Sequence, residues 1–408
     1  MNRDTDIVLF GATGFTGKLV AEYLALHAPP DVRVALAGRS LTKLEAVRSA
    51  LPPRASSWPL WVADSADPAS LAAVVSRTKV VITTVGPYAK LGLGMVEACA
   101  EHGTHYVDLT GEVQFIRDSI DRFDARAKAS GARIVHCCGF DSIPSDLGVW
   151  TLHEHLEQRG RGERLARTTL VVEAAKGGFS GGTIASLLNA LEEARTDRAR
   201  RKMMADPYGL SPDRAAEPDL GREGDLMSMR FDPFVDRWVA PFVMAAINTR
   251  VVRRSNALLG YAYGRRFRYS EVTGFRRGLK GVVSAAGLTG AMGAFMAAVS
   301  NETTRPLVER YLPKSGDGPT PEAIRDGFFR LRIFAETEGG ERLTCLIVGE
   351  RDPGYGETSK MLSQAALTLV LDEARLPARA GVLTPASAMG GLLRDRLVAA
   401  GMTFAIEA

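Results

Sequence analysis

The stretch VLFGATGFTGKLVAEYL, from Val8 to Leu24, joins a short apolar run to a helix-like pattern through three glycines. Gly11, Gly14 and Gly17 are spaced three apart, a variant of the glycine-rich turn that binds dinucleotide pyrophosphates. The first glycine permits the tight turn, the second lets the backbone approach a phosphate, and the third lets the helix pack closely on the sheet. The free N–H groups at the start of that helix would face the phosphate charge. The stretch therefore predicts a strand–turn–helix unit that binds a dinucleotide, and a purely structural turn is the alternative.

Strand and helix patterns alternate from the N-terminus to residue 146. Strand-like runs occur at 6–10, 32–38, 60–64, 79–86, 105–111 and 132–139, with helix patterns between them. This alternation is typical of a doubly wound parallel sheet with helices on both faces. We therefore expect an α/β protein with an N-terminal Rossmann domain over residues 1–146.

The rhythm changes after residue 147. The later patterns predict a strand at 168–177, one long helix at 182–204, a hairpin at 331–350 that turns at Gly339 and Gly340, and helices at 357–374 and 384–401. We expect residues 147–352 to form an α+β domain for substrate binding or dimerisation, built on a mostly antiparallel sheet. Residues 353–408 form a separate helical segment in this interpretation.

Composition and charge exclude several classes of protein. The 408 residues carry a formal net charge of +4, a balance that does not call for a nucleic-acid partner. The four cysteines show no C-x-x-C spacing, which favours free thiols in a reducing compartment. The N-terminus runs into a strand pattern without a secretory signal, so we expect a cytoplasmic protein.

The end of the second strand bears on the choice of dinucleotide. NAD-binding proteins usually place an Asp or Glu there to accept from the ribose hydroxyls. This chain has Gly38, Arg39 and Ser40 instead, with Lys43 one turn later. Arg39 can stack on adenine and pair with a 2′-phosphate, which Ser40 can also bond. NADP(H) is therefore the predicted cofactor, and an ordinary surface arginine is the alternative.

Further cofactor contacts follow from the carboxyl ends of the strands, where ligands bind in such sheets. Asp64 ends the third strand, where it either meets the adenine or caps the next helix, and 85–87 ends the fourth, on the nicotinamide side. The candidate cofactor-binding residues are Gly11, Thr13, Gly14, Phe15, Thr16, Gly17, Gly38, Arg39, Ser40, Lys43, Asp64, Val85, Gly86 and Pro87.

Seven blocks spread over residues 8–390 carry a family resemblance: FGATGFTG, TVGPY, YVDLTGE, CCGFDSIPSDLG, SGGT, DPGYGETSKM and GVLTPASAMG. Together they resemble the saccharopine dehydrogenase-like oxidoreductases, and among these the trans-acting enoyl reductase branch of mycobacteria. The resemblance implies an inserted α+β domain, a C-terminal segment that folds back on the Rossmann domain, and NADPH as hydride donor. It also implies reduction of a C=C bond in a lipid or polyketide acyl chain carried on a synthase or carrier protein.

Two other functions remain open beside this one. One is a saccharopine dehydrogenase-like reductase acting at a C–N bond, and the other is a non-catalytic nucleotide-binding protein on a membrane or lipid surface. The saccharopine-forming enzymes have a G-x-D-P-G type turn after the sixth strand, whereas this chain reads GFDSIP at 139–144. That departure disfavours saccharopine chemistry.

Enoyl reduction needs a hydride at the β-carbon, a donor to the enolate oxygen and a proton for the α-carbon. The hydroxyl of Tyr88, at the end of the fourth strand, suits the last two roles, and a packing aromatic is the alternative. Asp141 and Ser142 lie on the next loop expected near the nicotinamide, with helix capping as the alternative.

Substrate contacts are expected from Glu112, Ser180 and Thr183. Glu112 lies at another strand end, and the other two flank a glycine-rich helix start that would hold a substrate carbonyl or a phosphopantetheine phosphate. Turn chemistry and a plain helix start are the alternatives. No metal site is predicted, since the histidines of His153-Glu154-His155 point to different helix faces.

Residues 250–299 form the last unusual stretch. Nine Lys or Arg and one acid occupy 250–280, and no charge occurs in 281–299. The pattern leaves three interpretations open: a buried or dimer-forming helix, peripheral contact with an anionic membrane, and a membrane span. We also expect a homodimer.

Overall fold

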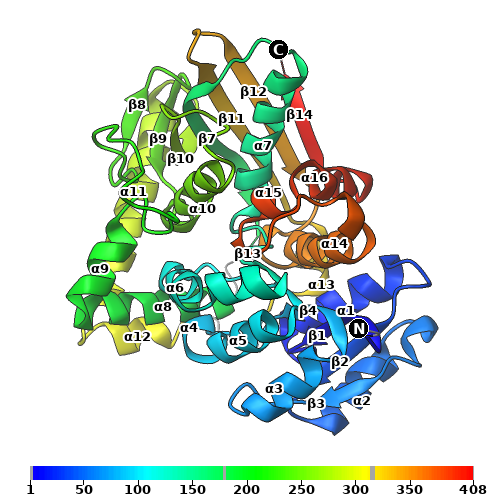
Figure 1. Cartoon of the computed structure of the whole chain (residues 1–408). Coiled ribbons are helices and arrows are strands. Elements are labelled where there is room, and N and C mark those ends of the chain that lie inside the picture. Colours follow the sequence, from blue (N-terminus) through cyan, green and yellow to red (C-terminus); the bar gives the residue numbers. More distant parts are fainter. Residues whose placement is uncertain (1–2, 178–180, 313–317, 408) are drawn as a thin grey trace.

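The protein is built from two seven-stranded sheets with a layer of helices between them (Figure 1). The computed structural model describes residues 3–177, 181–312 and 318–407. Sheet A belongs to the N-terminal domain and sheet B to the second, so the predicted fold class is confirmed.

Sheet A is parallel throughout and is buried on both faces. Its strand order is β13 (Gly381–Leu383), β6 (Arg133–Val135), β5 (His105–Val107), β4 (Thr78–Thr83), β1 (Thr5–Phe10), β2 (Val34–Gly38) and β3 (Leu60–Val62). In β1, Ile7 and Leu9 pack with helices α1 (Phe15–His27), α2 (Leu41–Ala50) and α14 (Thr358–Leu371). Val8 and Phe10 face α3 (Pro68–Val75), α5 (Leu93–His102) and α6 (Val113–Ser130) on the other side. The apolar strand runs follow from this double burial.

Sheet B is mostly antiparallel. Its order is β14 (Thr403–Glu407), β12 (Arg342–Gly349), β11 (Phe328–Thr337), β7 (Leu165–Lys176), β10 (Arg268–Phe275), β9 (Arg237–Pro241) and β8 (Arg230–Asp232), and only the β7–β10 pair is parallel. The predicted hairpin is β11–β12. It turns at Gly339 and Gly340, and Gly340 adopts φ +86°, a conformation that favours glycine.

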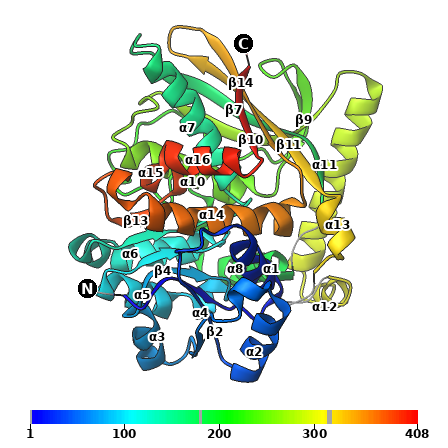
Figure 2. The same ribbon diagram turned by 90° about the vertical axis from the view of Figure 1, so that its right-hand side faces the viewer.

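The C-terminal segment contributes to both sheets. β13 extends sheet A beside β6, and β14 extends sheet B beside β12. Between them, helices α15 (Pro385–Ala388) and α16 (Gly390–Ala399) pack on α7 (Ile143–Gln158) and α14 in the central layer (Figure 2). The carboxylate of Asp146 in α7 accepts from Ser255 Oγ at 2.5 Å and from the N–H of Ala386 at 2.7 Å, and so joins α7 to α15 and to the helix that holds Ser255, α10 (Ala245–Leu258). Burial raises the pKa of Asp146 to about 7.

The long helix predicted at 182–204 is wrong, because the structure has two helices there, α8 (Gly181–Thr196) and α9 (Arg198–Ala205). Asp197 causes the break: its carboxylate accepts from the N–H groups of Ala199 and Arg200 and caps α9. The remaining helices are α4 (Tyr88–Leu91), α11 (Leu279–Ser300), α12 (Arg305–Glu309) and α13 (Pro321–Arg325).

The arginines at the start of the basic stretch 250–299 do not form a membrane-facing surface. Arg250, Arg253 and Arg254 lie on α10 and are all buried. Arg250 pairs with Asp225, and Arg253 pairs with Glu223. These acids lie in the connection between α9 and β8, which was not predicted to cover α10. The exposed part of the stretch is therefore limited to residues beyond α10.

Arg254 is expected to be important for stability. Its guanidinium donates to the carbonyls of Leu210 at 2.7 Å and Val382 at 2.6 Å, and burial lowers its pKa to about 10. Arg254→Met leaves both carbonyls without this donor, so we expect the free energy of unfolding to fall by about 3 kcal/mol. Urea denaturation followed by circular dichroism measures the change, and Arg266→Met, at an exposed arginine, is the control. Equal free energies of unfolding for Arg254→Met and Arg266→Met would contradict the stabilising role of the Arg254 hydrogen bonds.

Candidate functional site

The carboxyl ends of β1, β4, β5 and β6 meet at one edge of sheet A. Four loops leave the sheet there, at residues 11–14, 84–87, 108–112 and 136–142. They carry eight of the seventeen predicted cofactor and catalytic residues, among them Asp141 and Ser142, and this edge is therefore the candidate active site.

Two glycines of the first loop are required by packing. Gly11 has φ +91°, and a Cβ there would lie 2.7 Å from Thr84 Oγ1. A Cβ on Gly17 would lie 2.1 Å from the carbonyl oxygen of Gly11. Thr84 Oγ1 donates to that same oxygen at 3.1 Å and holds the loop against the end of β4. The close approach of α1 to the turn thus depends on Gly11 and Gly17.

Gly14 is open to solvent instead. The carbonyl oxygen of Gly11, at 3.4 Å, is the only described atom within 4 Å of a Cβ placed on Gly14. Helix α1 begins at Phe15 without a side-chain cap. The N–H groups of Phe15, Thr16 and Gly17 have no acceptor in the described part of the chain. An uncapped helix start beside an open glycine fits the pyrophosphate of a dinucleotide.

The adenosine side is formed by the ends of β2 and β3. A Cβ on Gly38 would lie 3.9 Å from the side chain of Thr13, so the loop after β2 lies against the loop after β1. Arg39 and Lys43 are exposed, and neither forms an ion pair with another described residue. Ser40 caps α2, and its Oγ accepts from the N–H of Lys43 at 3.4 Å. Arg39 is thus free to meet a 2′-phosphate.

Asp64 does not cap the next helix. Its Oδ1 accepts from the N–H of Ala66 at 3.0 Å within a tight turn, and Asp67 caps α3. The helix-cap alternative is therefore wrong, and the contact of Asp64 with adenine stays a prediction.

On the nicotinamide side, Val85 is half-buried and Gly86 is exposed, while Pro87 precedes the first turn of α4. Tyr88 turns away from this edge. Its side chain is 4% exposed, and its hydroxyl donates to the carbonyl of Thr83 at 3.1 Å. Burial and the charge of Asp108 raise its pKa well above the usual range. The structure favours the packing role for Tyr88 over that of proton donor.

Glu112 is buried and connects the two domains. Its Oε1 accepts from the N–H of Tyr88 at 2.8 Å and from Ser186 Oγ at 2.6 Å, and its Oε2 accepts from the N–H of Ala89 at 2.9 Å. Burial raises its pKa. These contacts indicate that Glu112 positions the start of α4 against α8 rather than contacting substrate.

The two other predicted substrate residues cannot be placed in the same way. Ser180 lies outside the described residues. Thr183 lies in α8, and its side chain is outside the described part of the structure.

Asp141 is partly exposed at the candidate edge. Within the described chain its carboxylate has neither a hydrogen-bond donor nor a cation. A Cβ on Gly111 would lie 3.4 Å from Asp141 Oδ2, so the β5 and β6 loops meet here. Burial, with a smaller contribution from the charge of Asp108, raises the pKa of Asp141 to about 7. A carboxyl group with that pKa can exchange a proton near neutral pH.

Ser142 is buried behind Asp141. Its Oγ donates to Asn248 Oδ1 at 3.0 Å and makes no cap contact with α7, so the capping alternative is wrong for this hydroxyl. Asn248 Nδ2 donates in turn to Glu271 at 2.9 Å. Ser142 is therefore placed to orient the loop rather than to touch substrate.

A buried cluster beneath these loops was not found from the sequence. His136 Nδ1 donates to Asp108 Oδ2 at 2.7 Å, and His136 Nε2 lies 2.8 Å from Ser119 Oγ. All three side chains are at most 2% exposed, so this Asp–His–Ser arrangement is closed to a substrate. The N–H of Cys137, which has φ +61°, donates to Asp108 Oδ1 and fixes the start of the Asp141 loop. The signal was present, since Asp108 and His136 both follow strand runs, but the sequence does not give their pairing.

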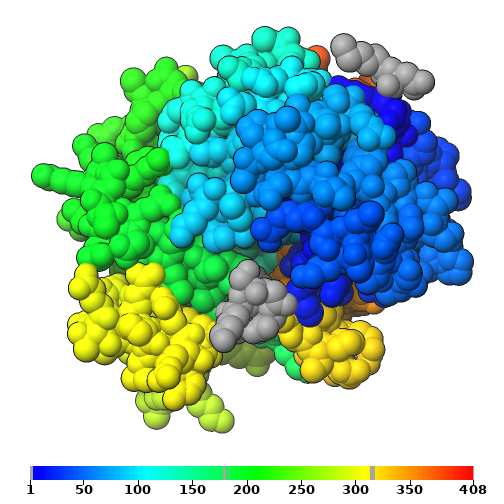
Figure 3. Space-filling model, turned by 90° about the horizontal axis from the view of Figure 1, so that it is seen from below, coloured from blue at the N-terminus to red at the C-terminus, as the bar shows by residue number. Residues whose placement is uncertain are grey.

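A cavity of about 410 Å³ adjoins the nicotinamide side. Pro87 and Lys90 form one wall, and α8 and α12 form the others. In the view of Figure 3, the yellow segment that includes α12 lies beside the green segment that includes α8 and α9. The described residues that line this cavity are Pro87, Lys90, Gly181, Ile184, Ala185, Leu188, Asn189, Glu192, Arg305, Glu309 and Leu312.

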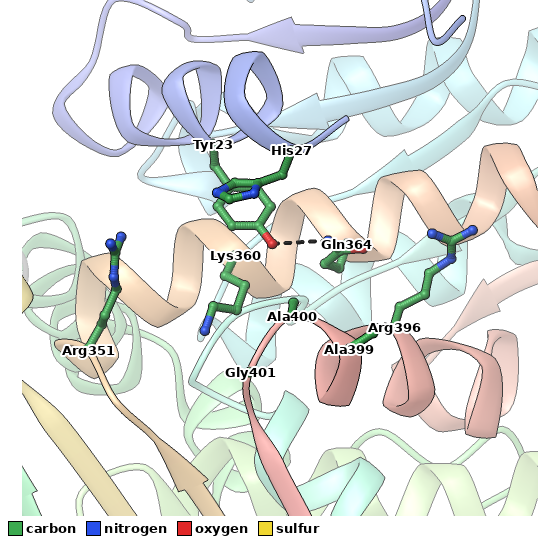
Figure 4. Close-up of a pocket in the computed structure, with 9 residues that line it drawn as sticks. All are labelled: Tyr23, His27, Arg351, Lys360, Gln364, Arg396, Ala399, Ala400 and Gly401. Carbon is green, nitrogen blue, oxygen red and sulfur yellow. Dashed lines mark hydrogen bonds between the residues drawn. The ribbon is translucent and has the colours of Figure 1, made fainter. Parts of the chain in front are cut away.

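A larger cavity, of about 570 Å³, lies between α1, α14 and α16 (Figure 4). Tyr23 and His27 come from the C-terminal half of α1, so this cavity is at the opposite end of that helix from the glycine loop. Two of its cations already have partners: Lys360 pairs with Glu357, and Arg396 pairs with Asp372. It is separate from the dinucleotide edge.

Comparison with known proteins supports this assignment of the edge. A family model described as the saccharopine dehydrogenase NADP-binding domain matches residues 7–135, which confirms NADP(H) as the predicted cofactor. Rv2449c of Mycobacterium tuberculosis, provisionally named a trans-acting enoyl reductase, is 49% identical and covers 98% of this chain and 97% of its own. The trans-acting enoyl reductases of Mycobacterium tuberculosis and Mycobacterium leprae are 44% and 43% identical with the same coverage. Saccharopine dehydrogenase (L-Glu forming) of Saccharomyces cerevisiae has the same fold, with a TM-score of 0.54, 13% identity and 99% of each chain covered.

The variant Gly14→Ala tests the predicted pyrophosphate site at the start of α1. The added methyl group meets no described atom closer than 3.4 Å, so the fold tolerates it, but it fills the space that faces the phosphates. We expect NADPH to bind about tenfold more weakly or worse. Fluorescence titration of NADPH measures the Kd, with Gly224→Ala as a control at a glycine in open space. An unchanged Kd would place the pyrophosphate elsewhere.

Arg39→Ala tests the discrimination between the two nicotinamide dinucleotides. Loss of a charge-assisted contact to the 2′-phosphate should raise the Kd of NADPH on the order of 10- to 100-fold. The Kd of NADH should stay the same, because NADH lacks that phosphate. Parallel titrations of both nucleotides measure the ratio, and equal weakening of the two would contradict the role of Arg39.

Proposed function

Because the chain belongs to the trans-acting enoyl reductase branch of the saccharopine dehydrogenase-like family and is an NADP-dependent oxidoreductase, we propose that it reduces the C=C bond of a lipid or polyketide acyl intermediate. The substrate in this proposal is an enoyl thioester carried by a separate synthase or carrier protein. The observation that carries the proposal is the carboxyl group of Asp141, which has no partner among the described residues and a pKa of about 7, at the nicotinamide edge.

The proton chemistry follows from the position of Asp141. NADPH bound at this edge would supply the hydride for the β-carbon, and the resulting enolate of the substrate would need a proton at the α-carbon. At neutral pH a carboxyl group with a pKa of about 7 is protonated in about half of the molecules, so it can donate this proton. After turnover the partly exposed carboxylate takes up a proton from solvent.

The cavity beside Pro87 supports an acyl substrate. Ile184, Ala185 and Leu188 of α8 give it an apolar wall on which a hydrocarbon chain can lie. Glu112 holds α8 to the start of α4 through Ser186 and so fixes this wall relative to the nicotinamide side. The carrier's phosphopantetheine would enter from the open rim.

The same cavity disfavours an amino-acid substrate with several carboxylates. Among the described residues, the cations that line it are Lys90 and Arg305, and Arg305 already pairs with Glu192 and Glu309. Saccharopine would need several free cations there, so action at a C–N bond is the weaker candidate.

The experiment for the proposed function is a turnover assay. Purified protein is mixed with NADPH and 2-enoyl thioesters of increasing chain length, and NADPH oxidation is followed by absorbance while mass spectrometry detects the gain of two hydrogens. Faster turnover of long chains supports an apolar acyl site. Turnover of a keto acid with an amino acid in place of the thioesters would favour the C–N reaction, and binding of NADPH with no turnover of any substrate would favour a non-catalytic protein.

Asp141→Asn removes the proposed proton donor. We expect kcat to fall on the order of 100- to 10,000-fold while the Kd of NADPH stays unchanged. In the wild-type enzyme kcat should decrease as the pH rises through about 7, because the acid form is lost. The pH profile of kcat for both proteins is the measurement, with Asp121→Asn on α6 as the control. A wild-type profile that is flat between pH 6 and pH 8 would assign the proton to another source.

The free energy of unfolding distinguishes a catalytic role of Asp141 from a structural one. The pKa of Asp141 is higher in the folded state than the ordinary value of 3.8, so ionisation opposes folding as the pH rises from about 4 to about 7. Asp141→Asn removes that penalty, and its free energy of unfolding at pH 8 should be no lower than that of the wild type. Loss of activity together with clear destabilisation at pH 8 would indicate a structural residue.

A further inference from the structure

Helix α11 is a 22-residue apolar helix on the surface of the molecule. Among the described residues it is the one helix long and apolar enough to cross a membrane, and only 11% of its most apolar 18-residue window is buried. Leu279 is 79% exposed and Val283 is 62% exposed. Soluble domains rarely leave a continuous apolar surface of this kind in water.

One side of α11 packs on sheet B, and the rest stands away from it (Figure 2). The close contact is at the N-terminal end, where Gly281 lies near Trp238 of β9, and Ala285 is buried one turn later. The apolar residues continue around the helix, so this packing leaves the outward side uncovered.

The flanking chain argues against a span. The strand before α11 ends at Phe275 and the strand after it begins at Phe328, and both strands lie in sheet B. A span of about 33 Å would carry the two flanks to opposite sides of a bilayer. The helix can meet a membrane only along its side.

The charges around α11 are complementary to an anionic surface. Arg276 and Lys280 are exposed at its N-terminal end, and neither pairs with a described carboxylate. Arg277 beside them pairs with Asp236. No acid occurs between Glu271, which is buried, and Glu302. Cations next to an apolar helix face are the combination that binds anionic lipid headgroups and acyl chains together.

We propose that α11 lies in the interface of an anionic lipid bilayer, with Leu279 and Val283 among the acyl chains and Arg276 and Lys280 at the headgroups. The surface is smaller than the stretch 250–299 predicted from the sequence, because the arginines of α10 are buried. Binding itself does not depend on the proposed reaction. If that reaction is correct, the membrane also lies close to the substrate cavity, since α11 leads into α12, which lines it.

Sedimentation with lipid vesicles tests this surface. The full-length protein should sediment with vesicles of phosphatidylcholine and phosphatidylglycerol, less with phosphatidylcholine alone, and less in high salt. The double variant Leu279→Asp/Val283→Asp should lose binding at least tenfold. Arg276→Gln and Lys280→Gln should each weaken binding to the anionic vesicles on the order of fivefold. Leu26→Asp, at a leucine of α1 that is 54% exposed, is the matched control and should bind as the wild type does.

Two further measurements make the result decisive. Circular dichroism and NADPH titration should be unchanged in the α11 variants, since the substituted side chains are exposed. Sedimentation velocity without lipid tests whether a second copy of the chain covers α11. Absence of wild-type binding to both kinds of vesicle overturns the proposal, and so does conversion of a dimer to a monomer by Leu279→Asp/Val283→Asp. Those outcomes leave the reductase assay unaffected, so the two proposals can fail separately.

Discussion

The buried carboxylate of Asp108 organises the edge at which the chemistry is proposed. It is fully buried and accepts four hydrogen bonds, from the Tyr106 hydroxyl, His136 Nδ1 and the N–H groups of Thr110 and Cys137. Burial of a carboxylate without hydrogen-bond partners lowers the stability of the fold. The conformations of the loops after β5 and β6 therefore depend on the hydrogen bonds that they donate to Asp108. The same charge contributes to the raised pKa of Asp141. A structural anion below the site thus helps to keep the carboxyl group above it protonated.

Much of the N-terminal domain could be predicted because its signals are local. The glycine spacing, the apolar strands and the absence of an acid at Arg39 are all read within a few residues, and the described fold and the family match agree with them. The hairpin β11–β12 was predictable for the same reason, since alternation and the glycine pair specify it.

The remaining features depend on contacts between distant segments. Tyr88 turns inward because a packed position beside Phe115 and an acceptor at Thr83 are available, and neither is apparent from its neighbours in the chain. The short strands β13 and β14 have three and five residues and become strands only through their partners. The burial of Arg250 and Arg253 in the basic stretch could not be predicted for a similar reason, since the acids that neutralise them lie some 25 to 30 residues earlier in the chain.

The C-terminal segment has a consequence for how the chain is made. β6 pairs with β5 on one side and with β13 on the other, so its outer edge has no partner until β13 has been made. During synthesis the N-terminal domain emerges first, with a hydrophobic parallel sheet that lacks its final strand. An open edge of this kind can pair with other chains. Synthesis of β13, rather than completion of the nucleotide-binding sequence, is therefore the step that covers the outer edge of β6.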